Sequence, residues 1–180
     1  AGKSTLMKCL AGVHQPNAGE VAVDGNLVSI PDVRAAEKLG IAFIHQELNL
    51  AENLNIGANV FLGREPRKFG PFFDRREIRL RTQGLLDALE LDVTPDTPVR
   101  NLSIGHRQMV EIAKALSQKA RILIMDEPTS SLSLHETRIL FRLVKKLREE
   151  GMCIVFISHR IAEVEEIADR VIVLKDGRNS

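Results

Sequence analysis

The sequence predicts an α/β fold with a parallel sheet that helices cover. Through the last third of the chain, apolar strand-like runs alternate with helical patterns, an order typical of parallel sheets. The expected strands are rich in Ile, Val, Leu and Met, as in sheets buried on both faces. Polar groups follow the strand ends, where open α/β sheets hold their ligands. The expected strands are 122–125, 153–158 and 171–174, with helices at 134–150 and 162–168.

Length and composition fit a single domain with room for a subdomain. The chain has 180 residues, of which 44% are hydrophobic, enough to bury a core. Its 25 basic and 24 acidic side chains give a net charge of +1, so we expect no nucleic-acid partner. The apolar runs are far shorter than the roughly 20 residues that cross a bilayer, so we expect a soluble domain.

The two cysteines show no metal-binding or redox spacing. Cys9 falls in an expected helix and Cys153 in an expected strand, with no C-x-x-C pattern. We therefore expect two buried, unreactive thiols in a reducing cytosol.

The first part of the chain supplies further elements of the sheet layer. A helix is expected over 4–10, and Gly12 has the position of a C-terminal cap. The alternating residues 20–23 precede Asp24 and Gly25, a pair typical of hairpin turns. Residues 40–45 read as a buried strand that ends at Gln46.

Residues 47–116 show helical patterns separated by loops, and 66–74 is the least regular stretch. Phe72 and Phe73 in this stretch could form a partner surface, but the reading we favour folds them back onto their own domain. Asp74 then caps a helix that runs to about residue 91. Its apolar stripe consists of Ile78, Leu85, Leu86 and Leu89.

The opening residues resemble part of a phosphate-binding loop. Of the pattern G-x-x-x-x-G-K-[ST], only the last four positions are present, because the chain begins at Ala1. We therefore expect a fragment of a longer polypeptide. Lys3 would neutralise the β- and γ-phosphates, and the Ser4 hydroxyl would ligate Mg²⁺. The alternative is a helix N-terminus with a surface lysine. The candidate nucleotide-binding residues here are Ala1, Gly2, Lys3, Ser4 and Thr5.

Two adjacent acids, Asp126 and Glu127, follow four aliphatic residues. A strand that ends in two acids buries negative charge, which costs free energy. A bound metal ion or a function as a catalytic base would account for that cost. Asp126 is the candidate Mg²⁺ ligand and Glu127 the candidate base that activates water. A helix cap would satisfy one of these acids, hardly both.

Gln46 and His159 also stand where expected strands end, in line with Asp126. At this edge they are candidates for holding the attacking water and the γ-phosphate, respectively. Gln46 is also a candidate nucleotide contact, and we place it with Ser4 and Asp126 among the Mg²⁺ ligands. The alternative for each is ordinary polar surface. The other histidines have no metal-ligand spacing.

Residues 102–105 precede a helix expected over 106–116. The backbone amides and the Ser103 hydroxyl at this helix start could bind an anion, and this second site could face the phosphate of another molecule. A simple helix cap is the alternative. Further along, Ser133 and Glu136 have the spacing of a capping box that starts a helix.

In this order the motifs resemble the nucleotide-binding cassette of ABC transporters, over essentially the whole chain. The resemblance implies a P-loop NTPase core with a parallel sheet, formed by 1–46 and 117–180, and an inserted helical subdomain, 47–116, that carries the signature motif. It assigns Gln46 to the Q-loop, Ser103 and Gly105 to the signature, 131–133 to the D-loop, and His159 to the switch histidine. It also implies two cassettes that enclose two ATP molecules, each held by the phosphate loop of one cassette and the signature of the other.

Finer features look like the first cassette of double-cassette monosaccharide importers of the ribose or galactose type. These features are the stretches 43–50, 61–65 and 109–116. The resemblance implies an ATP hydrolase, using ATP and Mg²⁺, at the cytoplasmic face of the cell inner membrane. Its partners would be permease subunits, a second cassette in the same full-length chain and, indirectly, an extracytoplasmic sugar-binding protein. Two positions depart from the family pattern: His106 replaces a Gln, and Ser133 replaces an Asp.

Two other functions remain open at this point. A soluble cassette ATPase of translation or DNA repair uses the same core without a permease. The short spacing from Lys3 to Leu102 leaves no room for the long coiled coil of a repair protein, and no basic insert marks a translation factor. A catalytically inactive regulatory cassette is disfavoured because Asp126, Glu127 and His159 are all present.

Overall fold

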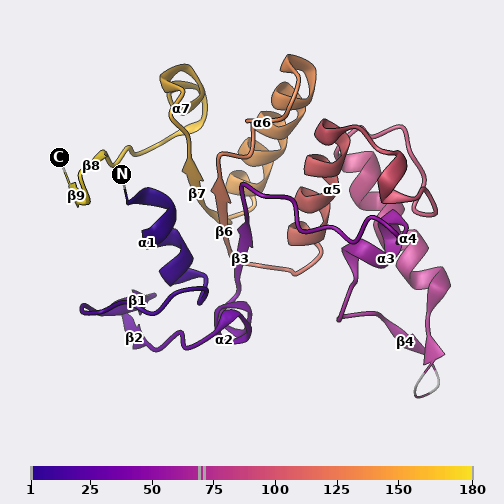
Figure 1. The fold of residues 1–180 in the computed structure, drawn as a ribbon, viewed down its shortest axis with the longest axis horizontal. Coiled ribbons are helices and arrows are strands. Elements are labelled where there is room, and N and C mark those ends of the chain that lie inside the picture. The colour runs from indigo at the N-terminus through magenta and orange to yellow at the C-terminus, as the bar shows by residue number, and fades with distance from the viewer. Residues whose placement is uncertain (1, 69, 71, 180) are drawn as a thin grey trace.

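The computed structural model describes residues 2–68, 70 and 72–179. At its centre lies a sheet of three parallel strands in the order β3-β6-β7 (Figure 1). The strands are β3 (Ile41–Ile44), β6 (Ile122–Asp126) and β7 (Cys153–Ile157). The predicted α/β fold with a parallel sheet is therefore confirmed.

The two faces of the sheet carry different sets of apolar side chains. Strand residues alternate between faces, so the aligned row Ala42, Leu123 and Ile154 packs into the larger core. The next row, Phe43, Ile124 and Val155, packs into a smaller core on the other face. Both faces are covered, which explains why the strand sequences are continuously apolar.

The smaller core is covered by elements from the first part of the chain. The antiparallel hairpin turns at Asp24 and Gly25, both with positive φ, as this pair predicted. Asp32 caps the second helix by accepting a hydrogen bond from the Ala35 amide. These elements are α1 (Lys3–Leu10), β1 (Val21–Val23), β2 (Asn26–Val28) and α2 (Val33–Lys38).

The larger core lies under helices from the middle and the end of the chain. Helices α5 (Ile104–Leu116) and α6 (Leu134–Glu149) bury Met109, Ile112 and Leu140 completely. Helix α5 also contacts α3, α4 and β3, so one continuous core joins these helices to the sheet. The remaining helical elements are α3 (Ile56–Val60), α4 (Arg75–Ala88) and the 3₁₀ helix Val99–Asn101.

Helix α4 has the cap and the buried stripe that its sequence predicted. Asp74 accepts a hydrogen bond from the Glu77 amide. Leu86 and Leu89 are fully buried, and Ile78 and Leu85 pack against them from partly buried positions. The expected capping box of α6 is also present, because Ser133 and Glu136 exchange hydrogen bonds.

The irregular stretch before α4 forms a small hairpin, β4 (Arg67–Lys68) with β5 (Phe72–Phe73). Phe72 is 71% exposed and Phe73 is 54% exposed, so the expectation that they fold back onto the domain is wrong. The reason is geometric: the hairpin projects away from α3 and α4 (Figure 1). Phe69 and Pro71, in the same stretch, lie outside the described residues.

After helix α7 (Ile161–Ile167) the chain departs from prediction a second time. The strand expected over 171–174 is wrong for its first three residues: Val171, Ile172 and Val173 are exposed and belong to no strand. Within the described ranges no strand lies beside them to take their backbone hydrogen bonds. The chain instead forms a hairpin of β8 (Leu174–Lys175) and β9 (Arg178–Asn179).

The cysteines differ in their surroundings. Cys9 is partly buried in α1, whereas Cys153 is exposed, so the expectation of two buried thiols is wrong for Cys153. Cys153 is the first residue of β7, an edge strand that pairs with β6 on one side only, and its side chain is exposed there. Among the helices of the described part of the chain, none has the length and apolar character needed to span a bilayer.

Candidate functional site

The carboxyl ends of the three parallel strands bring the predicted polar residues to one edge of the sheet. Gln46 follows β3, Asp126 is the last residue of β6, and His159 lies two residues beyond β7. The strand register pairs Ile44 with Met125, and Asp126 with Ile157, so the three ends lie level. Residues distant in sequence thus share one site.

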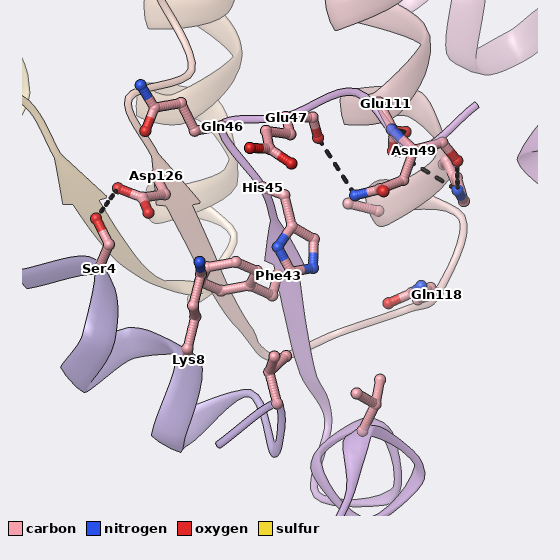
Figure 2. A pocket seen from close by; sticks show the side chains of 14 residues that line it. Ser4, Lys8, Phe43, His45, Gln46, Glu47, Asn49, Glu111, Gln118 and Asp126 are labelled. Atoms are coloured by element: carbon pink, nitrogen blue, oxygen red, sulfur yellow. Dashed lines mark hydrogen bonds and ion pairs between the residues drawn. The ribbon is translucent and has the colours of Figure 1, made fainter.

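Ser4 and Asp126 are in direct contact. The Ser4 hydroxyl of α1 donates a hydrogen bond of 3.1 Å to Asp126 Oδ1 (Figure 2). Asp126 is only 2% exposed, and a buried carboxylate needs polar partners or a cation. The contact fixes the first turn of α1 against the end of β6.

The residues around this contact suit Mg²⁺. A hydroxyl, a carboxylate and an amide oxygen, from Ser4, Asp126 and Gln46, are the hard oxygen donors that Mg²⁺ prefers. Among the described residues no cluster of three His, Cys, Asp or Glu side chains could hold a metal ion. A divalent ion here would therefore depend on the hydroxyl and the amide as well as on Asp126.

The start of α1 has the backbone geometry of a helix N-terminus that could hold an anion. Gly2 has φ of 97°, which a glycine adopts readily, and it places the chain at the entrance of an eight-residue helix. The first amides of a helix have no partner within the helix and attract negative charge. Lys3 and Ser4 are partly buried here, and Thr5 is exposed. Ala1, the remaining candidate, lies outside the described residues.

Glu127 and His159 form the second contact of the site. His159 Nδ1 lies 3.1 Å from Glu127 Oε1, and the Glu127 amide donates to the Ile157 carbonyl at 3.0 Å. Glu127 has φ of 48°, in the left-handed region that a glutamate rarely occupies. Strained conformations of this kind occur at functional sites, where the surrounding structure imposes them.

A pocket of about 570 Å³ opens beside these residues. Ser4, Gln46 and Asp126 line one side of it, and Lys8 and His45 lie next to them (Figure 2). Burial lowers the pKa of His45, helped by the charge of Lys8 and opposed by Glu111 and Asp126. His45 also packs edge-to-face on Phe43, with ring centroids 4.4 Å apart.

Ser103 and Gly105 are not part of this cluster. They begin α5, which packs on the face of the sheet opposite α1. The Ser103 hydroxyl accepts a hydrogen bond from the His106 amide, as a helix cap does. His106, one of the two departures noted above, has its Nε2 4.0 Å from a carboxylate oxygen of Glu136.

One element of the site that sequence reasoning missed is a clamp on the segment after Gln46. The Asn49 amide donates to Glu111 Oε1 at 2.6 Å, and Lys114 Nζ donates to the Asn49 carbonyl at 3.0 Å (Figure 2). Both side chains belong to α5, so the helix that begins at Ser103 holds the loop that contains Gln46. The only sequence signal was the polar pair Glu111 and Lys114 within a largely apolar helix.

Arg64, in the stretch 61–65, also holds two elements together through side-chain hydrogen bonds. Its guanidinium donates to the Val60 carbonyl at 3.0 Å and to the Ser117 hydroxyl at 3.1 Å, which joins the end of α3 to the end of α5. Burial lowers the pKa of Arg64, against the attraction of Glu37 and Glu65. The stretch 61–65 therefore holds the helices together rather than contributing to the pocket near Asp126.

Comparison with known proteins gives one family and several close relatives. The ABC transporter family model matches residues 1–130. The chain is 51% identical over 177 residues to the ribose import ATP-binding protein RbsA of Rhodopirellula baltica, covering 98% of this chain and 35% of that protein. It is 52% identical over 178 residues to a putative ribose/galactose/methyl galactoside import ATP-binding protein of Agrobacterium fabrum, covering 99% and 35%. The chain thus spans about a third of the length of these relatives.

Solved structures agree with the observed fold. A dimeric ATP-binding cassette in a post-hydrolysis state, bound to ADP and Pi, superposes with a TM-score of 0.82 at 28% identity, covering 99% of this chain and 80% of that one. A nucleotide-free cassette from an ABC transporter gives a TM-score of 0.84 at 22% identity, covering 99% and 74%, which supports the fold alone. Since the family model matches most of the chain and the fold is that of its solved cassettes, the chain belongs to the ABC transporter family.

Proposed function

We propose that the chain is the ATP-binding and ATP-hydrolysing cassette of an importer that takes up a monosaccharide such as ribose or galactose. The observation that carries the proposal is the pair of contacts at one sheet edge, Ser4 with Asp126 and Glu127 with His159. The names of the relatives, which are ribose and galactose import proteins, support the choice of substrate.

In this proposal the start of α1 binds the phosphates of ATP. The phosphates would contact the backbone amides of Gly2 and Lys3 and the Lys3 ammonium. Ala1 and Thr5 would contact the nucleotide on either side of these groups. Ser4, Gln46 and Asp126 would hold Mg²⁺, and a bound Mg²⁺ would neutralise charge that develops on the phosphates.

Glu127 is the proposed general base. Its carboxylate accepts the proton of the water that attacks the γ-phosphate, and Gln46 orients that water. His159, in contact with Glu127, holds the carboxylate in place and contacts the γ-phosphate. The strained backbone at Glu127 is consistent with this role, since it aims a side chain that the strand alone would point elsewhere.

Ser103 and Gly105 would serve a different ATP molecule. Their position on the face opposite α1 is consistent with a pair of cassettes. Each ATP in such a pair would lie between the phosphate loop of one cassette and the signature motif of the other. The proposed division into a catalytic core, 1–46 and 117–180, and a helical subdomain, 47–116, puts them in the subdomain. Because Glu111 and Lys114 clamp Asn49, movement of this subdomain would act directly on the loop of Gln46.

The partners follow from the family and remain part of the proposal. They are permease subunits that the Gln46 loop contacts, a second cassette in the full-length polypeptide and, indirectly, an extracytoplasmic sugar-binding protein. The cassette would lie at the cytoplasmic face of the membrane. Co-purification of a permease with the full-length polypeptide would support import; its absence, with ATPase activity retained, would favour a soluble ATPase.

Glu127→Gln in the full-length polypeptide tests the catalytic assignment. We expect ATP binding to persist and hydrolysis to fall by about 10²-fold or more, the usual contribution of a general base. Glu149→Gln, an exposed carboxylate at the end of α6, is the matched control and should keep wild-type turnover. Unchanged hydrolysis in Glu127→Gln would refute the base assignment.

A further inference from the structure

A buried carboxylate next to the site has no role in the mechanism above. Glu163 lies in the first turn of α7 and is only 8% exposed. Burying a carboxylate is costly unless hydrogen bonds and charges compensate it, so the surroundings of Glu163 show what it does.

Three side chains donate to the two oxygens of Glu163. Oε2 accepts hydrogen bonds from the Thr129 hydroxyl at 2.9 Å and from the Ser158 hydroxyl at 2.7 Å. Oε1 accepts one from the Arg160 guanidinium at 3.1 Å. The Ser158 oxygen also accepts from the Arg160 amide at 3.0 Å, which closes the network.

These partners come from the two loops that carry the proposed base and the switch histidine. Thr129 is two residues after Glu127, and Ser158 and Arg160 are the immediate neighbours of His159. Glu163 therefore bridges the loop after β6 to the loop after β7. The contact between Glu127 and His159 joins the same two loops, and the hydrogen bond from the Glu127 amide to the Ile157 carbonyl joins them again at the end of β7.

We propose that Glu163 is a positioning residue, which holds the loops 127–129 and 158–160 at the separation that brings His159 to Glu127. The inference rests on the proposed function, because it concerns the geometry of that site. One carboxylate oxygen shared by two hydroxyls fixes both loops to a single point, and a shift of about 1 Å at catalytic groups is enough to cost rate.

A role in stability alone is the competing explanation. It predicts that leucine at 163 lowers the free energy of unfolding, because the Thr129 and Ser158 hydroxyls lose their acceptor, while the enzyme that remains folded keeps its kcat. A positioning role predicts instead that full kcat requires a side chain at 163 that accepts hydrogen bonds from the Thr129 and Ser158 hydroxyls. Glutamine keeps an oxygen that can accept from Thr129 and Ser158, whereas alanine and leucine do not.

The first test is kinetic and uses the full-length polypeptide. In Glu163→Leu and Glu163→Ala we expect kcat to fall about tenfold or more, with KM for ATP unchanged, because Glu163 lies behind the loops and not in the pocket. Glu163→Gln should recover most of kcat. The matched control is Glu165→Ala, an exposed glutamate of the same helix, which should behave as wild type.

The second test does not depend on hydrolysis. Selectively labelled histidines report the ring of His159 by NMR, and Glu127→Gln should shift its signals because the two side chains are in contact. In the Glu163→Leu background the same change should shift them much less. An equal response in both backgrounds, or a folded Glu163→Leu enzyme with wild-type kcat, would overturn the inference. An intact NMR response in a protein that hydrolyses no ATP would instead refute the proposed function and leave the positioning role standing.

Discussion

Gly105 lies directly on the carboxylate of Glu136. A Cβ at position 105 would be 2.6 Å from Glu136 Oε1 and 2.7 Å from Oε2, closer than such atoms approach. The contact joins the first turn of α5 to the first turn of α6, and Glu136 also closes the capping box with Ser133. A side chain at 105 would therefore require the Glu136 carboxylate to move from its place in the capping box.

Gly105→Ala should displace Glu136 and weaken the start of α6. We expect the free energy of unfolding to fall by less than about 1 kcal/mol, because the loss of a cap costs about 0.5–2 kcal/mol and the better helix propensity of alanine offsets part of it. Urea denaturation measures it. Gly84→Ala is the matched control, because Gly84 is inside α4 with no atom near its added Cβ, and alanine there should stabilise. Equal stability of Gly105→Ala and wild type would contradict the observed contact.

Glu136 should make stability depend on pH. Burial alone would raise its pKa, but the hydrogen bonds from the Ser133 amide and hydroxyl, with the charges of His106 and His135, lower it below 4.5. A carboxyl with a lowered folded-state pKa stabilises the fold above its unfolded pKa, and this contribution is lost as pH falls through the folded pKa. Glu136→Gln should therefore be less stable than wild type at neutral pH, and the difference should vanish in acid. Unfolding midpoints of both proteins across the acidic range check this, and a difference that persisted in acid would refute it.

The clamp on Asn49 predicts a local effect rather than a global one. Glu111→Ala removes the acceptor of the Asn49 amide, so hydrogen exchange at 46–50 should accelerate while the core of α5 stays protected. A loss of about 1 kcal/mol of protection is expected for one such hydrogen bond. Exchange measured by mass spectrometry gives the result, with Glu149→Ala as the exposed control. Unchanged exchange at 46–50 would show that Lys114 alone holds the loop.

Elements with strong local signals could be predicted from the sequence. Helices α4 and α6 have side-chain caps and apolar stripes that act within a few residues. Strands β3, β6 and β7 are runs of aliphatic residues that a two-sided sheet requires. In each case the sequence pattern that marks the element lies within the segment itself.

The failures occurred where the deciding partner is distant. Residues 171–173 have a strand sequence, but a strand needs a neighbour, and the described residues place none beside them. Phe72 and Phe73 were expected to pack on their own domain, yet the hairpin carries them away from it. Cys153 sits in the expected strand, but burial there depends on its place at the sheet edge.

The candidate site divides in the same way. The contacts Ser4 with Asp126 and Glu127 with His159 follow from motifs that share a sheet edge, so their neighbourhood could be predicted. The bridge through Glu163 and the clamp by Glu111 could not, because their partners are 34 and 62 residues away and have no spacing rule. The left-handed backbone of Glu127 was also beyond prediction, since its amino-acid type argues against it.

The left-handed backbone at Glu127 lowers the stability of the loop that carries the proposed base. A non-glycine residue held there costs about 1–3 kcal/mol, and glycine would remove most of that cost. The protein with the most stable loop between β6 and α6 would therefore be one without the proposed base. Selection for stability alone would favour glycine at 127, and a need for the carboxylate there, as the proposed function has it, would oppose that change.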